Sequence, residues 1–367
     1  MRPVVVFVLA IFSPFALSQS IVNPYQYDRT TSADYQRLLS SSGSCDQKLI
    51  PAYIGDLVID SKYDQSDSSK SSLSSDYDAS SLKKVEHIRQ FMSFVAQQSW
   101  RAIYSDSESE RAKGVKCVSQ NMRIWARDSA LLRVKTSPTG VAQRKWFLAA
   151  VSSTLMQLDA RYEDYSVTSE ANDWLDDLAY QVIDDYNPRL VAQSKNINNH
   201  DYWAAWAVAA RSVLNDDAEL LSWSESVFDY AMNQVVIHQA TGLGYLPKEL
   251  ERGSLAANYH NYAMVPLMYL ADVLVVNGVD IDSVKTRLKA LAGITTRFIV
   301  SPGSLDSYIG SRQKAVSEGK RVWILPYAAV FGKDELINQI VQAGKVTTEY
   351  SQMGGDLWDF YSGRISQ

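Results

Sequence analysis

Histidine and cysteine, the residues that most often bind transition metals, are scarce in this chain. Its 367 residues include four histidines and two cysteines. No two of the histidines (His87, His200, His238 and His260) have the spacing usual for zinc ligands. The sequence therefore predicts no metal site and no cofactor.

Long apolar runs are missing after the first 20 residues, and positive charge is not in excess. No later stretch reaches the ~18 uninterrupted apolar residues that a membrane span needs, so we expect no membrane partner. The net charge of −5 argues against nucleic acid, which binds to a clustered basic face. An anionic polysaccharide remains compatible with this charge, because a local group of Arg and Lys can set the field in a cleft. We expect a monomer.

The first 20 residues are typical of a secretory signal sequence. Arg2 supplies the positive charge, Val4 to Leu17 the apolar stretch, and Ala16-Leu17-Ser18 a small-residue cleavage site. We therefore predict export to the periplasm or the extracellular space. An exported chain with two cysteines most simply joins them, so a disulfide between Cys45 and Cys117 is expected, with two buried free thiols as the alternative.

Strand signals are nearly absent, and helical periodicity dominates after residue 82. Apolar residues at i, i+3, i+4 and i+7 predict helices over 83–103, 115–132, 143–159, 170–185, 201–214, 221–237, 261–277, 281–300, 322–331 and 333–345. Gly and Pro fall between these segments, which favours short connections between antiparallel neighbours. The pattern indicates an all-α protein. A ring of helical hairpins, an α/α toroid, fits it, and a plain helical bundle is the competing architecture.

A serine- and aspartate-rich segment, Ser66 to Ser81, precedes the helices. It contains little apolar material and is expected to be exposed and mobile. Lys62 and Tyr63 lie just before it, and a mobile loop next to such a pair is a candidate lid over an active site. A disordered surface insertion is the plain alternative.

Two short stretches contain the groups needed to remove a proton from a carbon next to a carboxylate. A uronate C5 proton is hardly acidic while the C6 carboxylate is ionised, so this charge must first be neutralised. Asn199, His200 and Arg252 offer N–H donors and positive charge for such an anion clamp. Tyr259, seven residues after Arg252, could project to the same side, where the guanidinium would favour its phenolate. The pattern suggests β-elimination on a uronic acid polymer.

Each residue also has a structural interpretation. Asn199 and His200 can be a helix N-cap and a hydrogen-bonded core histidine. Arg252 alone is more often in a surface ion pair, and Tyr259 alone more often in the core. Glu249 could form the carboxylate pair of a glycoside hydrolase with its near neighbour Glu251, although two residues at i and i+2 on a helix point to different sides.

Several motifs, in order along nearly the whole mature chain, carry a family resemblance. They are Ser61-Lys62-Tyr63 with Ser66-Asp67, Thr139-Gly140 with Arg144-Lys145-Trp146, Asn198-Asn199-His200 with Tyr202-Trp203-Ala204-Ala205-Trp206, Leu246-Pro247 with Glu249-Leu250, Arg252-Gly253 with Tyr259-His260-Asn261-Tyr262-Ala263, and Gly354-Gly355-Asp356-Leu357. With these motifs the chain resembles the alginate lyases of polysaccharide lyase family 5, the poly(β-D-mannuronate) lyases.

The resemblance implies an incomplete α/α toroid with a deep cleft and a mobile lid loop at about residues 60–82, within a single catalytic domain over residues 21–367. It implies that Asn199, His200 and Arg252 neutralise the substrate carboxylate and that Tyr259 is both base and acid. The residues that match substrate-binding positions are Lys62, Tyr63, Trp146, Tyr262, Arg312 and Gln313. The lid is unusually rich in serine for this family, which leaves subsite preference open.

The expected activity is metal-independent β-elimination on β-D-mannuronate-rich alginate, which leaves 4,5-unsaturated uronate ends. Related sets of Asn, His, Tyr and Arg also serve lyases of glucuronan, hyaluronan and chondroitin, so another polyuronate is the first alternative. A non-catalytic protein that binds anionic polysaccharide is the second, and a hydrolase is the third.

Overall fold

A computed structural model of the chain describes residues 20–40, 44–67, 69–75, 77–190 and 197–366. The predicted signal sequence, apart from Ser20, lies outside the described residues. Among the described helices, none combines the length and the apolar character required to cross a membrane.

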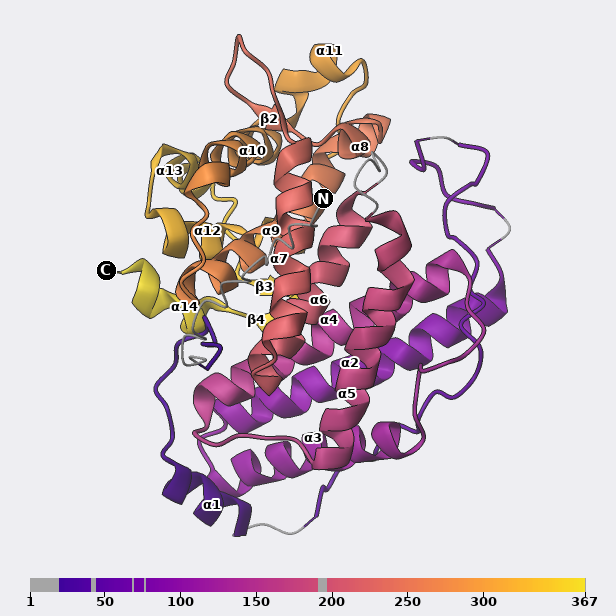
Figure 1. Cartoon of the computed structure of the whole chain (residues 1–367), viewed down its shortest axis with the longest axis vertical. Coiled ribbons are helices and arrows are strands. Elements are labelled where there is room, and N and C mark those ends of the chain that lie inside the picture. The colour runs from indigo at the N-terminus through magenta and orange to yellow at the C-terminus, as the bar shows by residue number, and fades with distance from the viewer. Residues whose placement is uncertain (1–19, 41–43, 68, 76, 191–196, 367) are drawn as a thin grey trace, which may run out of the picture.

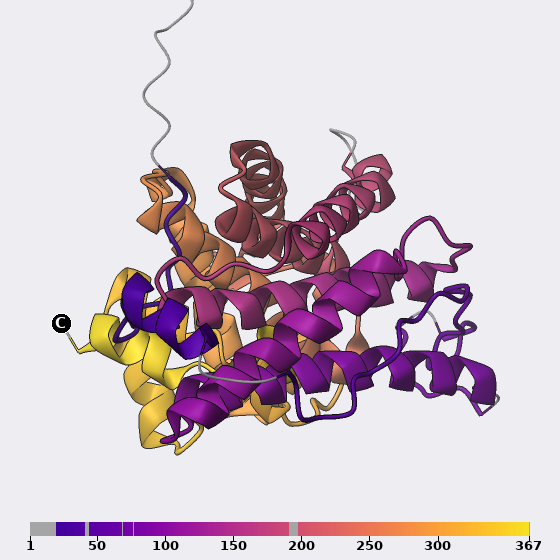
Figure 2. The same cartoon turned by 90° about the horizontal axis from the view of Figure 1, so that it is seen from below.

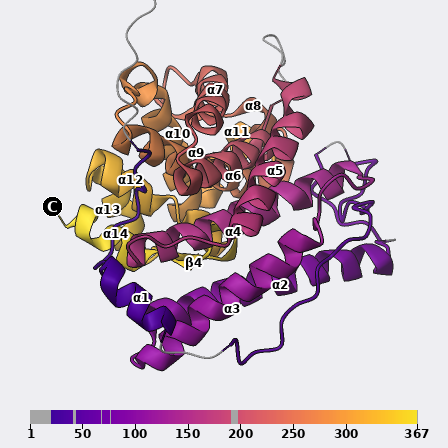
Figure 3. The same cartoon turned by 60° about the horizontal axis from the view of Figure 1, so that its bottom comes forward.

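Paired helices follow one another around a ring, and the two members of each pair form an inner and an outer row. The inner row consists of α2 (Ala79–Tyr104), α4 (Pro138–Arg161), α6 (Asn199–Asn215), α9 (Ala256–Val276) and α12 (Ile324–Phe331). The outer row consists of α3 (Glu108–Arg127), α5 (Ser169–Tyr186), α7 (Ala218–Gln234), α10 (Asp282–Val300) and α13 (Glu335–Gln342). Each inner helix packs on the next, from α2 through α4, α6 and α9 to α12. Figure 3 shows α2 and α3 on one side of α4, with α5, α6 and α7 on the other, and Figure 1 labels the same helices in another view.

Short elements complete the described structure. They are α1 (Ser32–Ser40), α8 (Pro247–Leu250), α11 (Asp306–Ile309), α14 (Trp358–Ile365), the 3-10 turns η1 (Asn187–Arg189), η2 (Gly253–Leu255), η3 (Pro302–Leu305), η4 (Glu318–Arg321) and η5 (Ser351–Met353), and the strands β1 (Val236–Ile237), β2 (Gly244–Tyr245), β3 (Glu349–Tyr350) and β4 (Gly355–Asp356). The strands form two antiparallel pairs, β1 with β2 and β3 with β4.

Three of the inner helices, α4, α6 and α9, are buried on almost every side, whereas α2 keeps one exposed face. In α9 the side chains from Ala256 to Leu274 are buried nearly without interruption, and α4 and α6 are similar. A helix with this pattern must be enclosed by neighbours, because burial of its apolar surface requires contacts around its whole circumference. The predicted all-α toroid is confirmed.

Several chain segments differ from the predicted helices. The helix predicted over 221–237 ends at Gln234, and Val236 and Ile237 pair instead with Tyr245 and Gly244. The turn between them includes Gly242 at φ +70°, a conformation that glycine adopts without the Cβ clash of other residues. Helices α1 and α14 were not predicted; each is only about two turns long, too short for periodicity to stand out.

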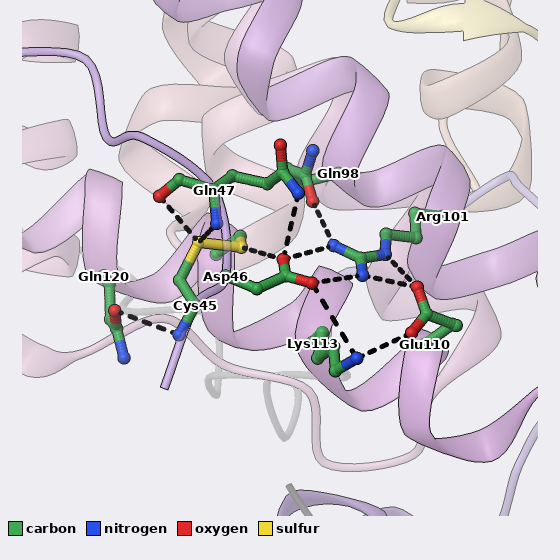
Figure 4. A network of polar contacts seen from close by, with 9 residues as sticks. Cys45, Asp46, Gln47, Gln98, Arg101, Glu110, Lys113 and Gln120 are labelled. Carbon is green, nitrogen blue, oxygen red and sulfur yellow. Dashed lines mark hydrogen bonds and ion pairs between the residues drawn. A yellow bond between two sulfur atoms is a disulfide. The ribbon is translucent and has the colours of Figure 1, made fainter. Parts of the chain in front are cut away.

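The predicted disulfide between Cys45 and Cys117 is present. It joins the N-terminal segment to α3 across 72 residues of sequence. Charged side chains surround it (Figure 4): the Arg101 guanidinium contacts both oxygens of Asp46, at 2.7 and 2.8 Å, and also the carboxylate of Glu110. The disulfide and this network fix the start of the segment that leads toward residue 60.

We expect Cys45→Ser combined with Cys117→Ser to lower the free energy of unfolding by about 3–4 kcal/mol, because the cross-link restricts a long loop of the unfolded chain. Thermal or urea unfolding of the variant and of the oxidised protein measures this difference. Equal midpoints would show that the disulfide adds no stability.

Residues 44–60 run beside the α2 and α3 pair and end at the predicted lid (Figure 2). The carbonyl of Ile50 accepts a hydrogen bond from the Trp125 indole at 3.1 Å. Farther along, the amide of Ile59 donates to Ser137 Oγ at 3.0 Å, and the amide of Asp60 donates to Ser81 Oγ at 2.9 Å. The last contact joins the two ends of the lid, so its base is fixed to α2.

Candidate active site

The N-terminus of α6 presents Asn199 and His200 because a different residue caps the helix. Asn198 is the N-cap: its side chain accepts from the amide of His200 at 3.0 Å, and Asp201 reaches back to the amide of Asn198 at 2.8 Å. This reciprocal capping box satisfies the free amides of the first turn. Arg189 holds Asp201 with two contacts, at 2.7 and 2.8 Å. The capping role considered for Asn199 therefore belongs to Asn198.

Asn199 is buried against the carboxylate of Glu249. Its backbone amide donates to Glu249 Oε1 at 2.7 Å, and its side-chain Nδ2 lies 3.0 Å from Oε1 and 2.9 Å from Oε2. Burial raises the pKa of Glu249 to about 7, although the bonds from Asn199 and the charge of Arg252 act in the opposite direction. Glu251, by contrast, is exposed and paired with Lys248 at 2.9 Å. A hydrolase pair of Glu249 and Glu251 is therefore disfavoured.

His200 is held by a buried lysine. Lys145 Nζ lies 2.8 Å from His200 Nδ1, and the His200 ring lies 5.7 Å from that of Trp146. The Lys145 side chain is fully buried, and this burial holds its pKa well below the usual value. Burial, followed by the charges of Lys145, Arg189 and Arg252, also lowers the pKa of His200. A neutral imidazole that accepts from Lys145 at Nδ1 has its proton on Nε2.

Arg252 and Tyr259 face each other across the turn that begins α9. Gly253, at φ +52°, starts the short turn η2, and α9 follows at Ala256. The Arg252 guanidinium carbon lies 4.6 Å from the centre of the Tyr259 ring, and Lys320 Nζ lies 5.7 Å from it. The side chains project to the same side, as their spacing predicted.

The expected phenolate of Tyr259 is not favoured in this conformation. Burial raises its pKa above the ordinary value, and the neighbouring Tyr63 raises it further by hydrogen bonding and by charge. The charge of Arg252 lowers the pKa, as predicted, but burial outweighs it. The physical reason is that removal of water disfavours the charged form more than one nearby cation favours it.

The lid contacts this group directly. Tyr63 forms a side-chain hydrogen bond with Tyr259. Farther along, Ser69 lies over the turn after Arg252. If Gly253 had a Cβ atom, this atom would lie 3.8 Å from the Cβ atom of Ser69. The charge of Lys62 acts on Lys320 and, after burial, lowers the pKa of that lysine to about 8. The described residues of the predicted lid therefore lie over the Arg252–Tyr259 turn.

The serine-rich segment, predicted to be exposed and mobile, is largely exposed, and its described residues form a turn around one aspartate. Asp67 Oδ1 accepts from the amide of Ser69 at 2.9 Å, and Oδ2 accepts from the amides of Ser71 and Ser72, both at 2.9 Å. The Ser69 hydroxyl donates to the same carboxylate at 2.6 Å. Serine is suited to this role because it is small and its hydroxyl competes well for local hydrogen bonds.

We expect Asp67→Ala to loosen this turn and to lower kcat/KM several-fold with a rise in KM, because Tyr63 would no longer be held at the site. Kinetics on polyuronate and limited proteolysis of the lid measure the effect. Leu73→Ala is the control, since this side chain is in the same loop, is 72% exposed and cannot accept hydrogen bonds. Equal protease sensitivity of Asp67→Ala and the unaltered protein would contradict the prediction.

The remaining predicted binding residues take different positions. Trp146 lies beside His200, and Tyr262 lies 5.1 Å from Trp203, ring to ring, with Lys320 Nζ at 5.4 Å. Gln313 is buried and its amide bonds to the backbone of the Arg252–Tyr259 turn, at Gly253 O and Ala257 N, each 3.0 Å away. Its neighbour Arg312 is exposed. Trp146 and Tyr262 thus lie at the site, whereas Gln313 supports it from behind.

Similarity to known proteins shows the family of the chain. The profile of the family described as "Alginate lyase" matches residues 58–303. The chain belongs to the alginate lyase family. An alginate lyase of Pseudomonas aeruginosa PAO1 is 31% identical over 336 residues, which cover 86% of this chain and 88% of that protein. An alginate lyase of Azotobacter vinelandii is 31% identical over 291 residues, or 76% and 74% of the two chains.

Solved structures support the fold of this alginate lyase family member. A variant of alginate lyase A1-III complexed with a tetrasaccharide superposes with a TM-score of 0.68 at 18% identity, over 95% of this chain and 99% of that one. Alginate lyase A1-III from Sphingomonas species A1 gives a TM-score of 0.63 over the same shares. At this identity the likeness establishes the toroid fold alone.

Three charged residues at the site were not among the predicted site residues. They are Lys145, Glu249 and Lys320. Lys145 lies between Arg144 and Trp146 in a helix that contains several other polar residues, so the sequence alone did not mark it as buried. Glu249 was weighed only as a hydrolase acid, since its contact with Asn199 spans 50 residues. Lys320 lies in η4, far along the chain, and its sequence neighbourhood indicates nothing unusual.

Proposed function

We propose that the protein is a metal-independent polysaccharide lyase that cuts β-D-mannuronate-rich alginate by β-elimination and leaves 4,5-unsaturated uronate ends. One observation carries the proposal: the N-terminus of α6, with Asn199 and His200, meets the Arg252–Tyr259 turn through Glu249. Alginate is also what the names of the relatives indicate. The domain is the chain from residue 21, with the lid at about 60–82.

The first task of the site is to neutralise the uronate carboxylate. Arg252 supplies positive charge and several donors, His200 supplies Nε2–H, and Asn199 supplies an amide. Lys145 holds the His200 ring, so this donor needs little rearrangement as charge develops on the carboxylate in the transition state. Lys320 adds a second positive charge near Tyr259. Such a cationic set can play the electrostatic part that a metal ion plays in other lyases.

The second task is proton transfer. In β-D-mannuronate the C5 proton and the C4 oxygen lie on the same face, so Tyr259 can take the proton and then donate it to the leaving oxygen. Its raised pKa suits the acid step, and it must first lose its proton to act as base. A substrate that displaces Tyr63 from Tyr259 would remove one of the contacts that raise the pKa. The charges of Arg252 and Lys320 would then favour the phenolate.

In α-L-guluronate the two groups leave from opposite faces, and a second residue is required. His200 is the available group, but its pKa is low and its Nδ1 is occupied by Lys145. This arrangement favours His200 as a hydrogen-bond donor and not as the second proton-transfer residue that guluronate requires. The site therefore favours mannuronate over guluronate. Trp146 and Tyr262 would stack on sugar rings, Lys62, Tyr63 and Arg312 would contact the polymer, and Gln313 would hold the turn beneath it.

We further propose an exported, monomeric enzyme whose partner is an anionic polysaccharide, without nucleic acid or membrane as partners. The disulfide supports export, because such bonds persist in oxidising compartments.

Absorbance of the conjugated C4=C5 double bond tests the activity. The mature protein, with chelator present, is mixed separately with polymannuronate, polyguluronate, hyaluronan and glucuronan. A rise on polymannuronate alone supports both reaction and substrate. A rise on another polymer alone supports the proposed reaction but contradicts the proposed substrate. Cleavage without a rise in absorbance, or no cleavage of any polymer, contradicts the proposed lyase activity.

A further inference from the structure

The side-chain amide of Asn199 leaves its oxygen free, and not its N–H group, so its orientation does not suit the role proposed above. Nδ2 is engaged with both oxygens of Glu249, at 3.0 and 2.9 Å. The other end, Oδ1, is buried and has no hydrogen-bond partner. A carbonyl oxygen repels a carboxylate, so Asn199 in this orientation cannot neutralise a uronate. A buried acceptor without a donor also costs free energy, and its presence at a functional site requires an explanation.

We propose that Glu249 is the positioning residue that sets which end of the Asn199 amide faces the substrate, and that a proton on Glu249 turns the amide N–H toward the uronate carboxylate. The proposal rests on the proposed function and adds a residue to it. No covalent bond to substrate is involved: solvent supplies the proton to Glu249 as substrate binds, and solvent takes it back after release.

The hydrogen-bond geometry explains why the proton is needed. If the amide turns while Glu249 is ionised, Oδ1 approaches a carboxylate oxygen, and two acceptors face each other in a buried place. If Oε2 carries a proton, it donates to Oδ1, and Oε1 still accepts from the backbone amide of Asn199, now at 2.7 Å. Both hydrogens on Nδ2 then become available for the substrate.

The surroundings place Glu249 near the balance between its two forms. Burial and the charge of Asp201 on α6 favour the protonated acid, whereas Arg252 and the Asn199 bonds favour the carboxylate, and the pKa rises to about 7. The other titratable groups whose charges interact with Glu249 are Tyr202 on α6, Tyr259 on α9, Lys145 on α4 and Lys320 on η4.

An incoming uronate adds a negative charge close to Glu249 and so raises its pKa further. Above neutral pH the free enzyme holds the carboxylate form and the complex holds the protonated form. Binding should therefore take up a proton, and the contribution of Glu249 to kcat/KM should fall as pH rises above the pKa of the free residue.

Glu249→Gln tests the role of this proton directly. The Oε1 atom of the introduced glutamine can accept from the backbone amide of Asn199, and its Nε2 can donate to Asn199 Oδ1. The variant imitates the protonated acid at every pH. We expect kcat/KM of the unaltered enzyme, divided by that of Glu249→Gln, to fall about tenfold per pH unit on the alkaline side of the Glu249 titration, because deprotonation of Tyr259 affects both enzymes alike. Glu251→Gln, on the exposed neighbour, is the matched control and should show the same fall relative to Glu249→Gln.

Calorimetry gives a second measurement that needs no change at Glu249. A mannuronate tetrasaccharide, or the oligomer of whichever polyuronate the absorbance test selects, is bound to Tyr259→Phe at about pH 8 in buffers of different ionisation heat. We expect uptake of roughly one proton per site, and none when Glu249→Gln is added. Binding without proton uptake, or a ratio of the two kcat/KM values that stays constant with pH, overturns the proposal. Absence of absorbance on every polyuronate would overturn the lyase function instead.

Discussion

Tyr259→Phe should abolish almost all turnover while leaving polymer binding intact. The substitution removes the hydroxyl that is proposed to take the C5 proton and to protonate the leaving oxygen. One positioned proton carrier typically contributes 10²–10⁴-fold, and a group that serves both steps should lie at the upper end, so we expect a fall of about 10⁴-fold in kcat. Arg252, His200 and the lid remain, and the phenyl ring keeps its place near the Arg252 guanidinium. The measurements are the rate of absorbance increase and the affinity for oligomannuronate.

Tyr269→Phe is the matched control for this prediction. It lies on the same helix and its hydroxyl is buried, but its ring packs in the core between Trp206 and Tyr361. We expect normal kcat in this variant. Near-normal turnover in Tyr259→Phe would show that another group carries the proton. A loss of affinity equal to the loss of rate would show that Tyr259 serves binding and not chemistry.

The helices could be predicted from the sequence because each repeats a local pattern. The outer helices show this best: α5 buries Ala171, Leu175, Leu178 and Val182 at helical spacing, and their polar faces make the period visible. The segment at Val236 was mispredicted because two apolar residues at a helix end look the same whether the chain continues as helix or turns into a strand. That choice depends on the tertiary partner, here Gly244 and Tyr245.

The site could be predicted only in part. Asn199 and His200 are adjacent, and Arg252 and Tyr259 are seven residues apart, so each pair was visible as a local motif. What joins the pairs was not visible. Glu249 bonds to Asn199, Lys145 bonds to His200, and Tyr63 bonds to Tyr259, each across at least 50 residues. The protonation states of the site residues follow from these long-range contacts and from burial, so they could not be inferred from the motifs.

These contacts assign a supporting partner to each proposed catalytic group. Lys145 acts on the His200 ring, Glu249 on the Asn199 amide, and Tyr63 on the Tyr259 hydroxyl. The first two partners are fully buried, but the third belongs to the lid. The partners of His200 and Asn199 therefore belong to the toroid itself, whereas Tyr259, the proposed proton carrier, would be released when the substrate moves Tyr63.

Lys145→Met should separate activity from stability. Methionine has nearly the same length, but it cannot donate to His200 Nδ1, so the ring would no longer be held with its proton on Nε2. Removal of one preorganised donor to a developing anion costs about 10²–10³-fold in rate, and we expect a loss of this size in kcat/KM. The melting temperature should stay the same or rise, because a buried ammonium is expensive and an apolar side chain in its place is not.

Nitrogen NMR of histidine-labelled protein tests the cause of that loss. We expect the His200 ring in the unaltered enzyme to show a proton on Nε2 and none on Nδ1, and we expect Lys145→Met to mix the two tautomers. His260 serves as the internal reference for the opposite tautomer, because its Nδ1 donates to Ala256 O at 2.9 Å and its Nε2 accepts from the Leu246 amide at 3.2 Å. Unchanged His200 signals with reduced activity would mean that Lys145 acts on the substrate through its charge. A lowered melting temperature would mean that the role of Lys145 is structural. Lost activity together with shifted His200 signals and an unchanged melting temperature would establish that Lys145 orients the His200 ring of the clamp.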